Sequence, residues 1–321
     1  DGEPALAPLR DLCGDGTLVL TIDSGQGREP YQGMVSLHGD TLAVGTSPTT
    51  GTAIERVYVY VRSGTTWTEQ GTITLNRNSG ERFGSQVSVH GDTIGLIAPV
   101  EGAGAAYLYA RSGTTWTQQT RIPGASWSID VQATTACVGN VGGASVYNRL
   151  GSTWTFRQSL TAPAATGTAV QSCALDGDSL AFGAPGTVGS AFVFLRTGSP
   201  GAESWSLQQQ LQPAAPPAYG RLGTSIAVAG DYAAVGATPN VNGTGDYTYI
   251  FRRTGSTWSE VQRIGFSIGR TGHGLAVAVV GADLFTSAVN GAVAWTFTTM
   301  RFTFLSPTAF VSECAACIGA W

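Results

Sequence analysis

The chain carries short stretches in which apolar and polar residues alternate, joined in pairs by a two-residue turn. In the clearest copy, residues 34–38 and 41–45 flank the dipeptide Gly39-Asp40. Alternation with a period of two and a tight Gly-Asp connection predict a β-hairpin. The same pattern recurs at intervals of 42 to 53 residues, around Gly91-Asp92, Gly177-Asp178 and Gly230-Asp231, and in weaker form around Ala133-Thr134 and Gly281-Ala282.

Each hairpin is followed by two further stretches of strand character. The third stretch often ends in arginine, and the fourth opens with a tryptophan after a turn. The third stretches are 57–62, 107–111, 191–196 and 247–252, and the tryptophans are Trp67, Trp116, Trp154, Trp205 and Trp258. Four antiparallel strands in a unit of about 45 residues are typical of one blade of a β-propeller.

The two ends of the chain predict one more blade. Residues 5–10 resemble a third strand and 16–21 a fourth, whereas 308–313 and 316–319 resemble a first and a second strand. A blade built from both termini closes the ring and leaves no free blade interface. We therefore expect an all-β fold, a single seven-bladed β-propeller domain over residues 1–321, whose closing blade combines segments 5–21 and 308–321.

Composition removes several classes of function. Only 12% of the residues are charged, against roughly a quarter in an average soluble domain, and the net charge is −4. Without a basic field we expect no nucleic-acid partner. The 42% of hydrophobic residues argues against disorder, and the lack of 18 consecutive apolar residues argues against membrane insertion. Residues 1–4 do not resemble a secretion signal, so we expect any such signal to be already removed.

The basic residues show an unusual bias, because all 17 of them are arginine. The repeat explains the abundant glycine and the low charge, but it does not explain the missing lysine. At the ends of the third strands we expect either basic residue to serve. GC-rich coding and selection for a surface without amines are the two explanations that remain.

Two motifs stand out within the repeats, namely Phe83-Gly84 and Gly183-Ala184-Pro185, beside the phrases GDTLAVG, VYVYVRSGTTW and ERFGSQVSVHGD. They resemble the FG-GAP repeat of integrin-α-type β-propellers, and especially its secreted bacterial branch. The resemblance extends over essentially the whole chain. It implies a propeller fold, and it allows adhesion, lectin or scaffold roles, because one fold can host many functions.

The resemblance also raises the question of calcium, since integrin-type blades often hold this ion in an Asp-rich loop between their first two strands. In this chain the corresponding connections are two-residue Gly-Asp turns. Such turns are too short to wrap an ion that takes six to eight oxygen ligands. We expect no calcium site of the family type, no other metal site and no cofactor.

Catalytic chemistry finds little support. The three histidines are His38 and His90, which share one repeat position before Gly-Asp, and His273 in a glycine-rich loop. A position that recurs with the repeat usually serves the repeat. The sequence contains no G-x-S-x-G elbow, no H-E-x-x-H motif and no P-loop lysine. The turn aspartates can satisfy local backbone donors, so we expect no enzyme.

The five cysteines predict disulfides better than a metal site. Cys314-x-x-Cys317 has the spacing of a metal or redox motif, but no second pair accompanies it. In the predicted topology Cys13 and Cys314 lie in turns on the same face of the closing blade, so they could join the two termini, with Cys317 as the competing partner. Cys137 and Cys173 lie on neighbouring blades and are candidates for a second bridge, provided their Cα atoms lie within about 7 Å.

The compartment follows from these bridges. Disulfides persist in oxidising surroundings, so we expect an extracellular or cell-surface location. Asn242-Gly243-Thr244 is the single N-glycosylation sequon, in a polar loop over 238–247, and we expect Asn242 to be accessible.

Two sets of loop residues are candidates for binding a ligand. Arginines precede the first strand of several blades, and a ring of them on one face would suit sulfate, carboxylate or an acidic glycan. They are Arg28, Arg82, Arg221 and Arg270. The favoured interpretation is structural: each arginine bonds carbonyls of its own loop or pairs with Glu29 or Glu81.

Aromatic residues form the second set. The fourth-strand tryptophans recur with the repeat, so we expect them to anchor the packing between outer strands. Trp127 and Tyr219 do not recur, and such irregular aromatics in loops between blades are better candidates for sugar contacts. Three functions follow, in order of support: an extracellular adhesion or assembly module that contacts proteins or itself, a lectin-like propeller that binds glycans, and an enzyme with a site in the central funnel.

Overall fold

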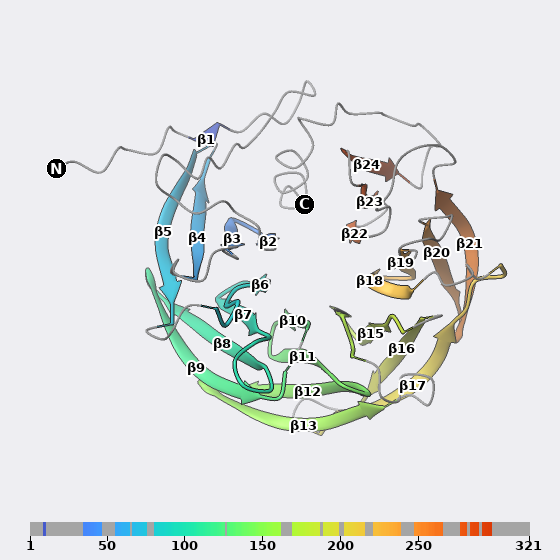
Figure 1. Cartoon of the computed structure of the whole chain (residues 1–321), viewed down its shortest axis with the longest axis horizontal. Coiled ribbons are helices and arrows are strands. Elements are labelled where there is room, and N and C mark those ends of the chain that lie inside the picture. The colour runs from blue at the N-terminus through green and yellow to red at the C-terminus, as the bar shows by residue number, and fades with distance from the viewer. Residues whose placement is uncertain are drawn as a thin grey trace. The chain divides into compact units, whose positions relative to one another are not determined.

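The computed structural model consists of β-strands in every regular element of its described residues. It describes residues 9–10, 35–46, 55–64, 66–75, 80–125, 127–161, 169–186, 189–198, 202–215, 221–238, 247–265, 277–280, 283–288 and 291–296, with the backbone alone for 9–10 and from 278 onward. In this part of the chain, no helix combines the length and the apolar character needed to cross a membrane. The strands form antiparallel sheets, which we call blades and number in chain order (Figure 1).

Two blades belong to a first compact unit, Asp1–Ala125 with Ala309–Trp321. Blade 1 contains β2 (Val35–His38), β3 (Thr41–Gly45), β4 (Arg56–Ser63) and β5 (Thr66–Thr74), and blade 2 contains β6 (Gln86–His90), β7 (Thr93–Ala98), β8 (Ala105–Ser112) and β9 (Thr115–Pro123). In both blades the strands pair in chain order. The first strands β2 and β6 lie against each other, as do the fourth strands β5 and β9.

The second compact unit, Ser126–Thr308, contains the remaining blades. Blade 3 contains β10 (Ile129–Gln132), β11 (Thr135–Asn140), β12 (Gly143–Leu150) and β13 (Thr153–Thr161). Blade 4 contains β14 (Ser172–Asp176), β15 (Ser179–Ala184), β16 (Ser190–Thr197) and β17 (Ser204–Leu211). Blade 5 contains β18 (Leu222–Ala229), β19 (Tyr232–Ala237), β20 (Tyr247–Thr254) and β21 (Thr257–Gly265), and a three-stranded blade 6 contains β22 (Val277–Val280), β23 (Asp283–Ala288) and β24 (Gly291–Thr296).

The hairpins and four-stranded units predicted from the sequence are therefore confirmed for blades 1 to 5. The predicted count of seven blades stays a prediction, because most of segments 5–21 and 308–321 lies outside the described residues. The exception is β1 (Leu9–Arg10), expected in the closing blade. In the structure it pairs with the outer edge of β5, Leu9 opposite Trp67 and Arg10 opposite Thr66.

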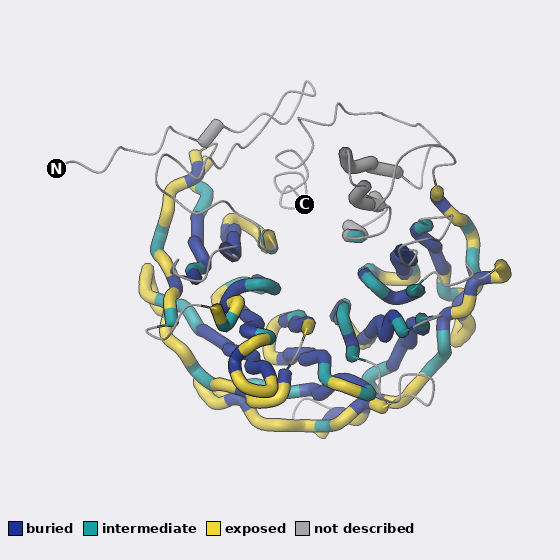
Figure 2. The backbone as a smooth tube through the Cα atoms, viewed as in Figure 1, coloured by how far each residue is buried: buried dark blue, intermediate teal, exposed yellow. Residues whose placement is uncertain are grey.

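The burial of each blade follows from the position of its strands. All residues of β3 and β7 are buried, whereas β5 and β9 bury a few positions and expose most of the others. Figure 2 shows the same contrast between second and fourth strands in the second unit. In blade 4, for example, one face of the second strand β15 packs in a cluster with blade 3 and the other in a cluster with blade 5. A fourth strand has solvent on its outer edge, so the outer strands can be polar while such inner strands cannot.

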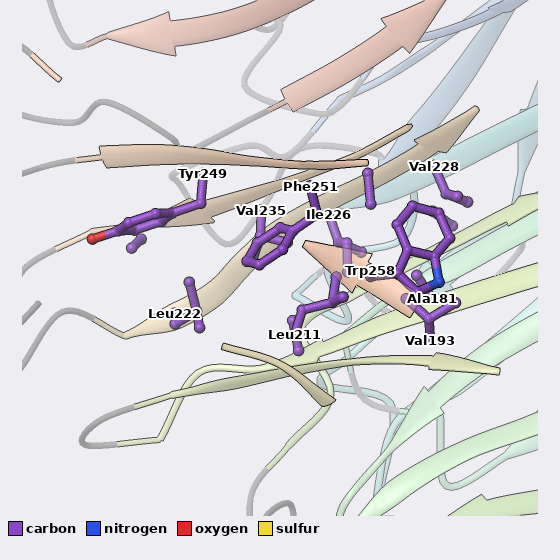
Figure 3. Packing of buried hydrophobic residues seen from close by; sticks show 14 residues of the cluster. Ala181, Val193, Leu211, Leu222, Ile226, Val228, Val235, Tyr249, Phe251 and Trp258 are labelled. Atoms are coloured by element: carbon purple, nitrogen blue, oxygen red, sulfur yellow. The ribbon is translucent and has the colours of Figure 1, made fainter. Parts of the chain in front are cut away.

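Hydrophobic clusters form where neighbouring blades meet. In one of them Tyr249, Phe251 and Trp258 of blade 5 pack with Val193 and Leu211 of blade 4 (Figure 3). A comparable cluster joins blades 1 and 2, in which Phe83 and Leu96 are fully buried. Burying a large apolar side chain contributes roughly 1.5–3 kcal/mol, so each blade depends on its neighbours for most of its stability.

Two blade contacts require glycine. A Cβ on Gly45 of β3 would lie 1.9 Å from the carbonyl oxygen of Gly84, and a Cβ on Gly183 of β15 would lie 2.1 Å from that of Gly223. Gly84 and Gly223 also have positive φ angles, of 81° and 92°, which L-residues with side chains rarely adopt. The Phe-Gly and strand-end glycine motifs of the sequence thus allow the backbones of successive blades to touch.

Candidate interaction surface

The arginine that ends each third strand takes part in a repeated three-residue contact. In blade 2, Arg111 Nη2 lies 2.8 Å from Asp92 Oδ1 of the β6–β7 turn, and its guanidinium lies 5.2 Å from the Trp116 ring centre. Blades 1, 4 and 5 repeat the arrangement with Asp40–Arg62–Trp67, Asp178–Arg196–Trp205 and Asp231–Arg253–Trp258. These residues connect the two turns at one end of a blade, so their role is structural.

This contact corrects the expectation that lysine would serve equally well there. Arg111 Nε and Nη2 bond Asp92, Nη1 donates to Thr41 Oγ1 at 3.0 Å, and the planar group stacks on Trp116. A single ammonium could not make these contacts together. The structure also shows that Arg253, rather than Arg252 at the predicted strand end, fills the position in blade 5.

Blade 3 departs from the repeat. Thr134 replaces the turn aspartate, while Arg149 keeps its place 5.8 Å above the Trp154 ring. The backbone N–H of Arg149 still donates to the Thr134 carbonyl at 2.8 Å. In blades 1, 2, 4 and 5 the corresponding arginine N–H donates to the carbonyl of the turn aspartate. The stacking therefore persists where threonine replaces the turn aspartate.

Of the four loop arginines proposed as an anion-binding ring, the structure describes two, one in each unit. Arg82 is exposed, with a φ of 57°, and its backbone N–H donates to the buried carboxylate of Glu55 at 2.6 Å. Arg221 is half-buried, with a φ of 41°, and its Nη2 donates to Gln171 Oε1 at 3.2 Å. Arg28 and Arg270 lie outside the described residues. The ring therefore stays a prediction, and the partner of Arg221 is the Gln171 side chain rather than a carbonyl of its own loop or one of the glutamates that the favoured interpretation names.

The buried acids of the described residues also have internal partners. Glu55 accepts N–H groups of Gly80, Arg82 and Phe83. Glu101 accepts a hydrogen bond from the Tyr107 hydroxyl, and Arg121 Nη2 lies 2.7 Å from its Oε1. Burial, reinforced by the bond to Glu101, raises the pKa of Tyr107. Within the described residues, no three His, Cys, Asp or Glu side chains are arranged so that they could hold a metal ion.

The structure brings Cys137 and Cys173 of neighbouring blades together as free thiols. Cys173 packs against the hydrophobic cluster that contains Cys137, and the buried Ser128 hydroxyl donates to Cys173 Sγ at 3.2 Å. Complete burial raises the pKa of Cys137, and its contact with Cys173 acts in the same direction. The disulfide between them stays a prediction. Other predicted sites lie outside the described residues: Cys13, Cys314, Cys317, Asn242, Tyr219 and His273.

Blade 3 has the most apolar exposed surface among the described blades. Half of the eight large hydrophobic side chains that the described residues expose lie here: Trp127 (43% exposed), Val141 (66%), Leu150 (86%) and Phe156 (57%). We call these four residues the blade 3 surface. Trp127 and Val141 lie at one end of the blade, and Leu150, the last residue of β12, lies at the other end.

Sequence reasoning identified Trp127 and missed the other three residues. Aligning the blades by repeat position would have found Leu150 and Phe156. Leu150 takes the place of Ser112, and Phe156 takes the place of Gln118, because each ends the same strand or pairs with the same third-strand position in blades 3 and 2. Trp127 likewise stands where blade 2 has Ser85.

No model of a known protein family matches the sequence, and no curated protein matches it either. Solved structures do resemble it. YjhT is 12% identical, with a TM-score of 0.52 over 86% of this chain and 97% of that one. A Bacteroides fragilis protein provisionally named a 6-phosphogluconolactonase is 11% identical, with a TM-score of 0.57 over 84% and 81%. The WD40 repeats of RRP9 are 11% identical, with a TM-score of 0.50 over 85% and 74%.

These structures are β-propellers, and the likeness assigns this chain to the same fold. Sequence identities this low support the assignment of the fold and nothing more, since a propeller can host many functions. One of the three bears an enzyme's name, so the fold is compatible with catalysis, and the likeness does not decide whether this chain is an enzyme.

Proposed function

We propose that this chain is a non-catalytic adhesion or assembly module of the extracellular space or cell surface, a seven-bladed propeller of FG-GAP type. It contacts other proteins or further copies of itself through the surfaces of its blades. The observation that carries the proposal is the blade 3 surface, because half of the large apolar side chains that the described residues expose belong to this one blade. Exposed apolar surface gathered in one region of a protein favours a contact that covers it.

The contacts made by the charged residues support the same proposal. The recurring arginines and turn aspartates are committed to contacts within and between blades. Buried Glu55 and Glu101 have backbone or side-chain partners. Because these charged groups already have partners, we expect the affinity for another protein to come mainly from apolar and neutral hydrogen-bonding groups.

The FG-GAP assignment rests on the packing of its defining residues. Phe83 is fully buried between blades 1 and 2, and Gly84 is the residue whose carbonyl oxygen closely approaches Gly45. Gly183 and Gly223 make the corresponding approach between blades 4 and 5. The motif residues thus have a physical role in this chain, one that a repeat of that type requires.

Sedimentation velocity over a concentration series tests self-assembly. The triple variant W127S/L150S/F156Q replaces three members of the blade 3 surface by the residues that blade 2 carries at the same positions. We expect the wild type to associate and the variant to associate at least about tenfold more weakly, a difference of roughly 1.4 kcal/mol. The matched control F156Q alone is expected to lie between them. Wild-type protein that stays monomeric over the whole range would contradict self-assembly.

Glycan binding is the second candidate, and the exposure of Trp127 favours it, because an exposed indole face can stack on a sugar ring. A glycan array separates the two functions. Binding by the wild type that W127S abolishes, in protein that sediments as a monomer, would favour the lectin. Association without glycan binding would favour the assembly module.

A further inference from the structure

Two histidines meet where blades 1 and 2 join. His38 ends β2 and His90 ends β6, and their ring centres lie 3.9 Å apart with an interplanar angle of 33°. His38 Nδ1 accepts the backbone N–H of Gly91, in the next blade's turn, at 3.1 Å. His38 is exposed, so protons reach its ring from solvent, whereas His90 is half-buried.

The same position connects blades elsewhere in the chain without histidine. Gln132 Oε1, at the end of β10, accepts the N–H of Gly177 at 2.8 Å. Asp176 Oδ2, at the end of β14, accepts the N–H of Gly230 at 2.6 Å. The last residue of a first strand thus serves as the hydrogen-bond acceptor for the turn of the next blade, and blade 1 uses an imidazole for that purpose.

An imidazole can accept this bond in its neutral form only. When Nδ1 accepts, the single proton of the ring is on Nε2. Protonation places a second N–H on Nδ1, directly opposite the N–H of Gly91, so an attractive contact becomes a meeting of two donors. The stacked second imidazole adds like-charge repulsion when both rings are protonated.

The charges around the pair do not offset this repulsion. Asp40, in the turn after β2, forms an ion pair with Arg62, whose Nε lies 2.9 Å from Asp40 Oδ1. Asp92, in the turn after β6, forms one with Arg111, whose Nη2 lies 2.8 Å from Asp92 Oδ1. Arg111 also reaches the first blade, where it donates to Thr41 Oγ1. Apart from the two histidines, β2, β3, β6 and β7 contain no ionisable side chain.

We propose that the contact of His38 with Gly91, beside the neighbouring ring of His90, is a pH-sensitive latch between blades 1 and 2. The latch is closed at neutral pH and opened by mild acid. The pKa of His90 has the matching direction: burial lowers it, and the neighbouring His38 lowers it further. A histidine whose folded pKa lies below its unfolded value of about 6.5 costs no stability above that pH. Stability then falls as the pH decreases through 6.5 toward the lower folded value.

The variant H38Q tests the latch, because glutamine is the acceptor that blade 3 uses and it does not titrate. We expect the ratio of unfolded to folded protein, from urea unfolding, to rise severalfold more for the wild type than for H38Q between pH 7.5 and 5.0, because only the wild type has a protonatable acceptor at this contact. Equal pH dependence in the two proteins would overturn the proposal.

A second measurement needs no variant. The ¹⁵N chemical shifts of the His38 ring at pH 8 report which nitrogen carries the proton. The latch requires the Nε2–H tautomer, with Nδ1 in the range of an unprotonated acceptor. A ring protonated on Nδ1 at that pH would overturn the proposal even if H38Q failed to fold.

Discussion

The contact between blades 1 and 2 and the contact between blades 3 and 4 follow one plan with different chemistry. In the first, Ser36 Oγ accepts the N–H of Val89 at 2.9 Å, and His38 accepts that of Gly91. In the second, Asp130 Oδ2 accepts the N–H of Leu175 at 2.7 Å, and Gln132 accepts that of Gly177. Both contacts therefore join neighbouring first strands through two side chains, two residues apart, that accept backbone N–H groups.

The outer strands differ more. Between blades 3 and 4, the Gln158 amide donates to the Trp205 carbonyl at 2.7 Å and accepts its N–H at 2.9 Å. Blade 1 has Gly71 at the position of Gln158, and there the outer contact is the bond from Trp116 Nε1 to Gln70 Oε1 at 3.1 Å. The comparison teaches that the repeat fixes where the blades touch, whereas the residues at those points set how strong and how pH-dependent each contact is.

The largest effect is expected from the glycines at which the backbone of one blade closely approaches the next, in blades 1 and 2 and in blades 4 and 5. Gly45→Ala would place a Cβ 1.9 Å from the Gly84 carbonyl oxygen, and Gly183→Ala would place one 2.1 Å from that of Gly223. Each should lower the free energy of unfolding by about 3 kcal/mol, the upper end for overpacking. Gly71→Ala, with no atom within 4 Å of the new Cβ, is the matched control. Urea unfolding measures all three, and equal losses would contradict the account of close approach.

The second largest effect is expected at the contact between blades 3 and 4, where Cys137 and Cys173 can be oxidised to a disulfide. Treatment with a small-molecule disulfide should link Cys137 to Cys173, with release of the small molecule as two thiols, and raise the free energy of unfolding by about 2 kcal/mol. The reaction should be slow, because burial raises the pKa of Cys137 and little thiolate is present. Peptide mapping before and after treatment checks the bond. C173S should gain no stability, and recovery of two free thiols from treated wild type would contradict the prediction.

A smaller loss of stability is expected from replacing the third-strand arginines, and it should differ between blade 2 and blade 3. Arg111→Lys removes the paired bonds to Asp92, the bond to Thr41 in blade 1 and the stacking on Trp116. We expect a loss of about 1 kcal/mol, since exposed ion pairs and cation–π contacts are individually weak. Arg149→Lys removes the stacking on Trp154, where threonine stands in place of the turn aspartate, and should cost less. Thermal unfolding at low and high salt measures both, and the Arg111 effect should shrink with salt because it includes the ion pair with Asp92.

Much of the fold could be predicted because it repeats. Alternation, Gly-Asp turns and the spacing of tryptophans located the strands of blades 1 to 5, since each feature is local in sequence. The exact register was harder: Arg252 was expected at the end of β20, but Arg253 faces Trp258, because the residue that points to that side depends on pairing across the blade. The pairing of β1 with β5 was missed for the same reason, since two residues of strand character do not specify a partner.

The candidate sites were less predictable from the sequence. Trp127 was identified because it breaks the loop pattern, while Leu150 and Phe156 were missed because they stand out only when they are compared with Ser112 and Gln118, the residues at the same repeat positions of blade 2. His38 and His90 were correctly read as repeat residues. Their contact with each other and with Gly91 depends on how two blades lie together, and no single blade's sequence contains that information.

Amide hydrogen exchange of Gly91, Gly177 and Gly230, measured in one wild-type sample as a function of pH, tests most directly the claim that these three contacts share one plan and differ in their acceptors. Each N–H is bonded by a first-strand side chain of the preceding blade, His38, Gln132 and Asp176 respectively. The account predicts protection of all three near pH 7.5, and a loss of at least about tenfold at Gly91 alone by pH 5.0, after correction for intrinsic exchange. Protection that falls equally at Gly91 and Gly177, or that is absent at all three at neutral pH, would contradict it.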